Sequence, residues 1–220
     1  MNEYILAIDE GTTGITVILF DKTANPVAKV YREIKQYYPT PGWVEHSPDE
    51  IAKSSIELIG EVVKKAEIEY GMIKSIGITN QRETTVLWDS ETGKPVYNAV
   101  VWQCRRSSEI CRNFKEKKLD TLIKEKTGLV VDPYFSATKI MWLLDNIEGL
   151  RDNALRGKIK FGTIDSWLLW NLTNKKAHLT DYTNASRTML FNIFTKKWDD
   201  SLCDLFRVPK SMLPEVRESV

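Results

Sequence analysis

Residues 9–14 read Asp-Glu-Gly-Thr-Thr-Gly, and this stretch decides the fold because of what lies on either side of it. The apolar run Tyr4–Ile8 precedes it, and a second apolar run, Ile15–Phe20, follows it. Glycine lets a backbone come close to a ligand, and successive N–H groups in such a turn attract anions. The stretch therefore predicts a phosphate-binding turn between two strands. Walker A loops and dinucleotide fingerprints lead into a helix instead, so neither fits this context.

The elements that follow extend this pattern. A third strand is expected at Val27–Ile34, after a turn-forming stretch. Ser47 is placed to cap a helix, with Pro48 at its first position and Glu50 three residues beyond the cap. A fourth strand is expected at Ile73–Thr79. The order β-β-β-α-β predicts an α/β fold, a ribonuclease-H-like half-domain of the actin and hexokinase type of ATPase, with a mixed sheet.

The rest of the chain is predicted to be mainly helical, with short strands between the helices. Because no linker separates two folded parts, residues 1–220 are treated as one domain with a helical insertion. Helices are expected at 104–118, 119–127, 136–147, 150–156, 165–172 and 198–206, and strands at 84–88, 159–162 and 188–193.

Composition limits the classes of function. With 42% hydrophobic residues among 220, the chain can bury a sizeable core, and a formal net charge of +1 indicates neither a nucleic-acid nor a membrane partner. The first apolar run stops at Asp9, too early for a signal peptide. Three cysteines without a C-x-x-C pair are expected to be reduced, partly buried thiols, which favours a cytoplasmic protein.

Several longer stretches resemble the amino-terminal half of the FGGY family of carbohydrate kinases, and among its members those that act on glycerol. The similarity extends over nearly the whole chain. The matching stretches are Asp9–Thr13, Pro41–His46, Gly77–Thr85, Trp102–Arg106, Gly128–Ser136 and Thr180–Thr188.

The resemblance implies a function and a site. It implies transfer of a phosphoryl group from ATP, with Mg²⁺, to glycerol to give sn-glycerol 3-phosphate, by an enzyme that is often a homo-oligomer. It implies that the phosphate turn and the polyol residues face one cleft. The residues so implied are Arg82, Glu83 and Tyr134 on the polyol hydroxyls, Trp102 against its carbons, Gly11, Thr12, Thr13 and Gly14 on the nucleotide phosphates, and Asp9 near the metal.

The residue types suit that chemistry. Each glycerol hydroxyl both donates and accepts, and adjacent Arg and Glu side chains supply donors and acceptors for charge-assisted hydrogen bonds. A site built around hydroxyls rejects analogues that lack them, because its own polar groups would be left unpaired. Phosphoryl transfer then requires an aligned hydroxyl and neutralised phosphate charge.

Two positions depart from the family pattern, which usually has Gln in place of Glu10 and Arg in place of Thr16. Because a charge-assisted hydrogen bond contributes roughly 1.5–3 kcal/mol, loss of that arginine predicts nucleotide binding weaker by about ten- to a hundredfold. An anion at Glu10 would weaken it further if it faced the phosphates. The family's catalytic aspartate and adenine pocket lie beyond the matched region. No general base is therefore assigned here, and the 220-residue chain alone is expected to be inactive.

Other readings stay open. The chain could be a non-catalytic polyol- or nucleotide-binding half-domain, or a related kinase for a longer polyol. A ribonuclease-H-type nuclease needs several carboxylates around two metal ions, whereas the fourth strand ends in Thr79-Asn80-Gln81. By themselves, Arg105 and Arg106 indicate a solvated helix start, although Arg105 could also support the site from behind.

Overall fold

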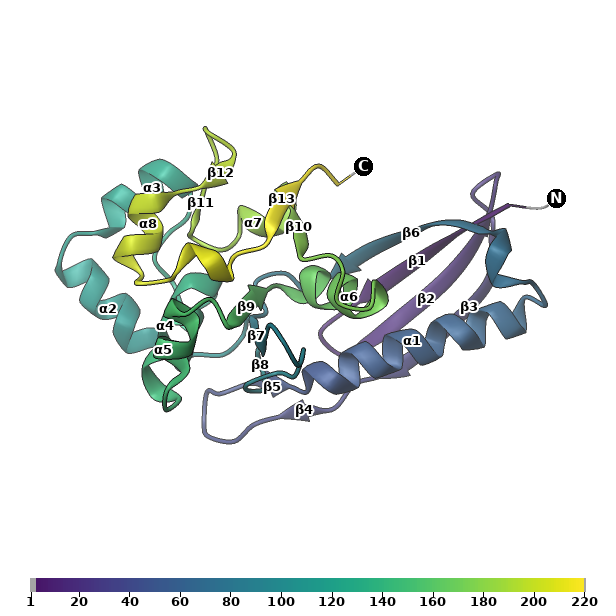
Figure 1. Ribbon diagram of the computed structural model, residues 1–220, viewed down its shortest axis with the longest axis horizontal. Coiled ribbons are helices and arrows are strands. Elements are labelled where there is room, and N and C mark those ends of the chain that lie inside the picture. Colours follow the sequence, from purple (N-terminus) through teal and green to yellow (C-terminus); the bar gives the residue numbers. More distant parts are fainter. Residues whose placement is uncertain (1–2, 220) are drawn as a thin grey trace. The chain divides into compact units, whose positions relative to one another are not determined.

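The computed structural model describes residues 3–219, which fold as two units (Figure 1). The first unit holds residues 3–36 and 46–81, and the second holds residues 37–45 and 82–219. Two two-residue strands, β4 (Gln36–Tyr37) and β5 (Glu45–His46), lie where the chain passes from one unit to the other.

The first unit is built on a four-stranded mixed sheet with the order β3-β2-β1-β6. β1 pairs antiparallel with β2, β2 pairs antiparallel with β3, and β1 pairs parallel with β6. The expected order β-β-β-α-β and the ribonuclease-H-like fold class are confirmed. The strand bounds are β1 (Tyr4–Glu10), β2 (Gly14–Asp21), β3 (Pro26–Glu33) and β6 (Ile73–Asn80).

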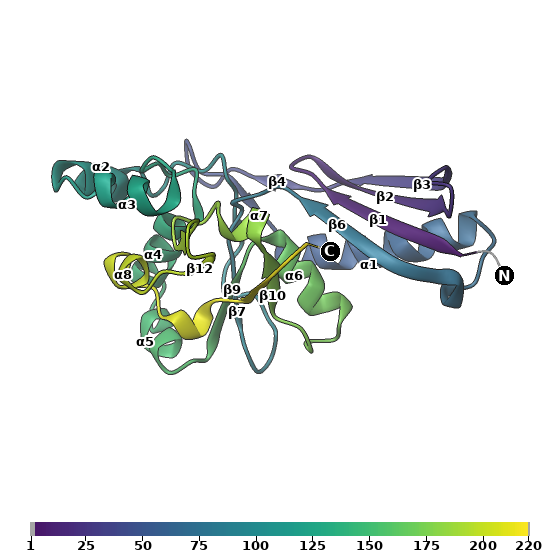
Figure 2. The same cartoon turned by 90° about the horizontal axis from the view of Figure 1, so that it is seen from above.

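Helix α1 (Pro48–Lys65) packs against β2 and β3 and is followed by a short 3₁₀ turn, η1 (Tyr70–Met72). Figure 2 shows the helix on one face of the sheet. The Ser47 hydroxyl accepts the backbone N–H of Glu50 at 3.2 Å, as the sequence predicts for a capped start. Side chains alternate along β1, so that Leu6, Ile8 and Glu10 are buried while Asp9 is exposed.

The second unit combines short strands with helices. β7 pairs antiparallel with β9, β10 pairs parallel with β13, and β11 pairs antiparallel with β12. Its elements are β7 (Val86–Asp89), β8 (Ala99–Val100), α2 (Ser108–Glu116), α3 (Asp120–Thr127), α4 (Ser136–Asn146), α5 (Leu150–Leu155), β9 (Ile159–Gly162), α6 (Ile164–Leu172), β10 (Leu179–Asp181), α7 (Tyr182–Ala185), β11 (Phe191–Asn192), β12 (Lys197–Trp198), α8 (Asp200–Leu205), η2 (Lys210–Met212) and β13 (Glu215–Arg217).

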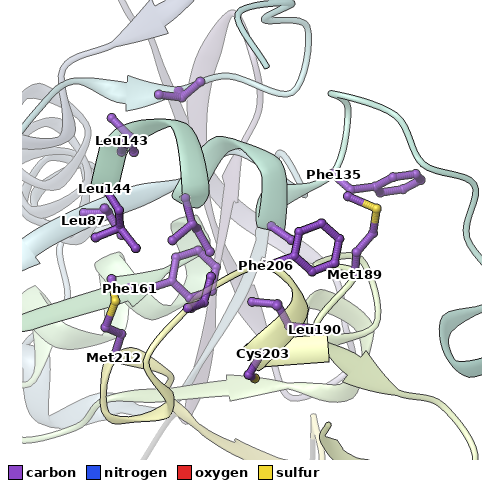
Figure 3. Packing of buried hydrophobic residues seen from close by; sticks show 14 of the residues in the cluster. Leu87, Phe135, Leu143, Leu144, Phe161, Met189, Leu190, Cys203, Phe206 and Met212 are labelled. Carbon is purple, nitrogen blue, oxygen red and sulfur yellow. The ribbon is translucent and has the colours of Figure 1, made fainter. Parts of the chain in front are cut away.

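One apolar cluster forms the core of this unit, and Figure 3 shows part of it. Phe161 of β9 and Leu143 of α4 are both 1% exposed, and Phe206, which follows α8, is 0% exposed. The rings of Phe114 and Phe206 stack 4.9 Å apart. This core joins α2, α4, α8 and β9, and so gives the short strands and loops of the unit a fixed support.

Three predicted elements differ from the observed ones. The helix expected at 104–118 begins at Ser108, because turns precede it in which Cys104 N–H bonds to the Val101 carbonyl. The strand expected at 188–193 shrinks to β11, since Met189 has a left-handed backbone with φ 62°. Trp198 lies in β12 rather than in a helix, because Asp199 caps α8 by accepting the N–H of Leu202.

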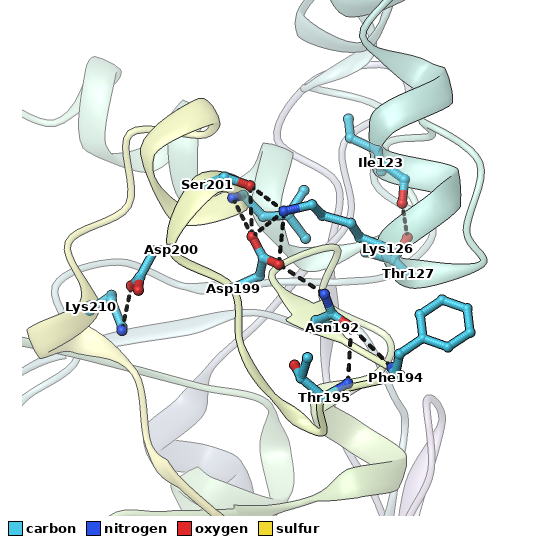
Figure 4. A network of polar contacts seen from close by, with 11 residues as sticks. Ile123, Lys126, Thr127, Asn192, Phe194, Thr195, Asp199, Asp200, Ser201 and Lys210 are labelled. Carbon is cyan, nitrogen blue, oxygen red and sulfur yellow. Dashed lines mark hydrogen bonds and ion pairs between the residues drawn. The ribbon is translucent and has the colours of Figure 1, made fainter.

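A polar network ties α3, β11 and α8 together (Figure 4). The Asp199 carboxylate accepts from Lys126 Nζ at 2.9 Å and from Asn192 Nδ2 at 2.9 Å. Burial raises the pKa of Asp199, but hydrogen bonds from Asn192, Ser201 and Lys126 outweigh it and leave that pKa below its ordinary value. The network stabilises the β11–β12 hairpin against the helices.

Candidate functional site

The turn between β1 and β2 closes tightly. Gly11 N–H bonds to the Gly14 carbonyl at 2.9 Å, and the Thr13 carbonyl accepts the N–H of Ile34 at 3.2 Å. A Cβ on Gly14 would lie 2.5 Å from Tyr31 Oη and 2.6 Å from the Arg32 carbonyl oxygen. Glycine is therefore required at position 14 by the close approach of β3.

Asp9 lies on the exposed face of the sheet, just before this turn. In the register of β1 and β2 it is opposite Thr16, and in that of β1 and β6 it is opposite Thr79. Residues directly opposite in a sheet project from the same face. Mg²⁺ keeps several waters and takes one or two protein carboxylates together with substrate phosphates. A single exposed carboxylate beside the glycine-bearing turn fits that requirement.

Glu10 points to the opposite, buried face and is 0% exposed. Its Oε1 accepts from Gln81 Nε2 at 2.8 Å, and within residues 3–219 its Oε2 has no hydrogen-bond partner. Desolvation raises the pKa of this carboxyl from 4.5 to about 8. Glu10 is thus neutral at pH 7 and lies away from the Asp9 face, so it places no anion beside the turn.

His46 completes this buried group. Its Nδ1 lies 3.1 Å from Gln81 Nε2, and in the described part of the chain its Nε2 is unpaired. Burial lowers the pKa of the imidazole from 6.5 to about 4. A neutral histidine, the Gln81 amide and a neutral carboxyl therefore lie together under the end of β1.

In the second unit, Glu83 is the centre of the predicted polyol residues. Its side chain is only 2% exposed and its carboxylate accepts from Arg187 Nε at 2.7 Å. Its backbone is left-handed, with φ 65°, and its carbonyl accepts from the hydroxyls of Ser136 and Thr85 at 3.1 and 3.2 Å. A buried carboxylate in an unfavourable backbone conformation is a frequent feature of functional sites.

The rings of Trp102 and Tyr134 contact each other, with centroids 5.4 Å apart. Both are half-buried. The backbone N–H of Trp102 donates to Thr84 Oγ1 at 3.3 Å, and Thr84 follows Glu83 in the chain. The Arg187 guanidinium lies 6.0 Å from the centre of the Tyr134 ring. The second unit therefore brings Glu83, Trp102 and Tyr134 together.

Arg82 is exposed, and in the described residues 3–219 no hydrogen bond or ion pair engages its guanidinium. Arg82 and Glu83 are therefore not an ion pair with each other, since Arg187 is the partner of Glu83. Sequence reasoning did not single out Arg187. Its only signal was its place in the Thr180–Thr188 stretch that resembles the family.

Arg105 acts behind Tyr134. Its Nη1 donates to Asp132 Oδ1 at 2.9 Å, and the same oxygen accepts the backbone N–H of Tyr134 at 2.9 Å. The ion pair thus fixes the turn that carries the Tyr134 ring.

The reading of Arg106 as a solvated residue is wrong. Its side chain is 0% exposed and its Nη2 lies 2.5 Å from Glu45 Oε1. The guanidinium lies over the rings of Trp43 and Trp142, at 4.0 and 4.8 Å. The ion pair and the aromatic faces compensate for the loss of water around this charge, which makes burial possible.

The expectation for the cysteines is confirmed. All three cysteines are buried and free. Trp167 and Trp170 belong to the core, at 1% and 7% exposure. Asp181 orders a loop, since it caps α7 by accepting the N–H of Asn184 at 2.7 Å.

Comparison with known proteins shows that this chain is similar to carbohydrate kinases. A family model described as the N-terminal domain of the FGGY family of carbohydrate kinases matches residues 4–220. A glycerol kinase of Petrotoga mobilis is 58% identical over 219 residues, which cover 100% of this chain and 44% of that protein. A glycerol kinase of Bacillus licheniformis is 56% identical, with the same coverage.

Solved structures of kinases also resemble this chain. The crystal structure of Plasmodium falciparum glycerol kinase with ADP aligns with a TM-score of 0.92 and 39% identity, over 98% of this chain and 43% of that one. A gluconate kinase from Lactobacillus acidophilus shares the fold, with a TM-score of 0.87 at 24% identity.

The fold and these neighbours define an α/β protein of the actin and hexokinase type. The chain belongs to the FGGY family of carbohydrate kinases. It spans less than half the length of the curated relatives it matches. Within residues 3–219, no helix is both long and apolar enough to cross a membrane.

Proposed function

We propose that this chain supplies the glycerol-binding pocket and the phosphate-binding turn of an ATP-dependent glycerol kinase, which makes sn-glycerol 3-phosphate. The observation that carries the proposal is the group formed by Glu83, Arg187, Trp102 and Tyr134. Arg82 precedes Glu83 in the chain, and its guanidinium has no partner within residues 3–219. High identity to glycerol kinases over the whole chain supports glycerol as the substrate.

In this pocket the polar groups bind the hydroxyls. Glu83 accepts from a glycerol hydroxyl while Arg187 fixes the position of its carboxylate, and Arg82 donates from the exposed side. The indole and phenol rings of Trp102 and Tyr134 cover the C–H edges and exclude water. A ligand with three hydroxyls uses all of these groups, whereas a deoxy analogue leaves the Glu83 carboxylate with Arg187 alone and one hydrogen bond fewer.

In the turn, the backbone N–H groups of residues 12–14 and the hydroxyls of Thr12 and Thr13 bind nucleotide phosphate, and Gly11 lets the backbone come close to it. Asp9 would hold Mg²⁺, and the ion would supply charge neutralisation of the phosphates when bound. No residue of this chain is proposed as the general base, and residues 1–220 are proposed to belong to one N-terminal kinase domain.

We also propose a cytoplasmic location, because three unpaired buried thiols suit a reducing compartment. Homo-oligomerisation of the whole protein is part of the same proposal. Sedimentation of the whole protein measures it directly.

Titration of the chain with glycerol, erythritol and xylulose by calorimetry tests the polyol pocket. Glycerol is expected to bind most tightly. Arg82→Ala is expected to abolish glycerol binding while the circular dichroism spectrum stays that of the wild type. The matched control is Arg112→Ala on α2, which removes an exposed arginine outside the pocket. Equal affinity of the Arg82→Ala variant would remove Arg82 from the site.

A phosphorylation assay with ATP, Mg²⁺ and glycerol tests the division of labour. We expect no turnover from the 220-residue chain and turnover from a protein of the length of its relatives. Turnover by the chain alone would show that a general base has been overlooked in it. Binding of MgATP without any binding of polyols would favour a nucleotide-binding module.

A further inference from the structure

Lys139 of α4 is fully buried although it lies next to the candidate polyol pocket. Its Nζ donates to the carbonyl of Pro133 at 3.3 Å and to the carbonyl of Tyr134. Burying an amine costs free energy unless its hydrogen bonds are satisfied. Desolvation lowers the pKa of Lys139 to about 7, against the opposing effect of Glu83. Leu or Met would fill such a core position at lower cost, so the amine has a specific contact to make.

The same turn of α4 holds the other parts of the pocket. The Ser136 hydroxyl donates to the Glu83 carbonyl at 3.1 Å. The Ala137 N–H donates to the Thr188 carbonyl at 2.9 Å, one residue after Arg187. Three segments that are far apart in sequence are therefore attached to the first four residues of one helix.

We propose that Lys139 is a positioning residue for polyol binding: it fixes the Pro133–Tyr134 backbone so that the Tyr134 ring stays against Trp102. The inference rests on the proposed function of those two rings as the wall of the glycerol pocket. Without the two N–H donors, the Pro133 and Tyr134 carbonyls lose their partner and that backbone relaxes. A displacement of about 1 Å in a binding group is enough to cost about a hundredfold in function.

Lys139→Met is the decisive variant, because it keeps the volume and flexibility of the side chain and removes every donor. Its glycerol dissociation constant is expected to rise at least tenfold, while the MgATP dissociation constant stays within twofold. Asn146→Ala is the matched control. It lies on the same helix and also loses a side-chain bond to a backbone carbonyl, that of Trp142, away from the pocket.

Two further measurements separate positioning from a general structural effect. Fluorotyrosine NMR, with the Tyr134 resonance assigned through Tyr134→Phe, is expected to show that resonance shifted in Lys139→Met and unchanged in Asn146→Ala. Lys139→Gln carries two N–H donors and no charge. It is expected to bind glycerol more tightly than Lys139→Met and less tightly than the wild type. If Lys139→Met does not fold, Lys139→Gln carries the test by itself.

Two results would overturn the positioning role of Lys139. Wild-type glycerol affinity and an unmoved Tyr134 resonance in Lys139→Met would overturn the proposal. Equal losses in the Met and Gln variants would also overturn it, because they would show that the charge matters and not the carbonyl contacts. If the wild-type chain binds no glycerol, the proposed function fails, and the Tyr134 resonance still decides whether Lys139 positions that ring.

Discussion

Replacing Glu10 by Gln is expected to change how the stability of the first unit depends on pH. Glu10 is buried beneath the end of β1 and its pKa is raised from 4.5 to about 8. Between pH 4.5 and about 8, Glu10 therefore keeps its proton in the folded state and has lost it in the unfolded chain. Unfolding becomes easier as pH rises through this window, and the stabilisation is complete only below the unfolded pKa.

The magnitude follows from the size of the shift. At about 1.4 kcal/mol per pKa unit, the full rise corresponds to about 5 kcal/mol. His46, with a pKa lowered from 6.5 to about 4, acts in the opposite direction below pH 6.5. Between pH 6.5 and 8 it no longer titrates, and Glu10 alone accounts for a loss of about 2 kcal/mol in this group.

The assay is urea unfolding from pH 5.5 to 8.5, with amides of β1 and β2 as reporters by pulsed hydrogen exchange. Glu10→Gln has the shape of the protonated acid and no titration. Its stability relative to the wild type is expected to grow with pH up to about 8 and then level off. The wild type and the variant share all other titrating groups, so these cancel in the difference.

Glu57→Gln is the matched control. It also removes one carboxylate from the first unit, but this one is exposed on α1 and bonded to Arg32, which lowers its pKa. Its effect is expected not to vary between pH 6 and 8.5. Parallel stability curves for Glu10→Gln and the wild type would refute the reasoning and show that Glu10 is ionised in the folded protein.

Three further variants test the turn and the pocket. Thr16→Arg is expected to tighten MgATP binding by about ten- to a hundredfold, because a charge-assisted bond to phosphate contributes roughly 1.5–3 kcal/mol; unchanged affinity in a calorimetric titration would contradict this. Gly14→Ala is expected to destabilise the first unit by about 1–3 kcal/mol through overpacking against β3, and a retained Tm would show that β3 moves aside. Arg187→Met is expected to weaken glycerol binding at least tenfold by releasing Glu83, whereas an unaltered dissociation constant would leave Arg187 a purely structural role.

How much of this the sequence could predict depends on the range of the interactions. The turn at residues 9–14, the capped start of α1 and the order β-β-β-α-β follow from patterns within a few residues, since strand alternation and helix periodicity are local. The resemblance placed Arg82, Glu83, Trp102 and Tyr134 in one site, and the last three were found together.

Contacts between distant segments could not be predicted in this way. Arg187 and Glu83 are 104 residues apart, and nothing in the local sequence of either names the other as its partner. The same holds for Arg106. Its place next to Arg105 suggested a solvated side chain, but Glu45 and the surrounding indole rings bury it.

The sequence by itself determined most of the strands and helices, and which family the chain belongs to. The tertiary structure alone decided the state of the ionisable groups. Glu10 is neutral, and Lys139 is bonded to two carbonyls, because of what packs around them. Burial is set by elements that meet in space, and it changes the free energy of a charge far more than any neighbour in the chain does.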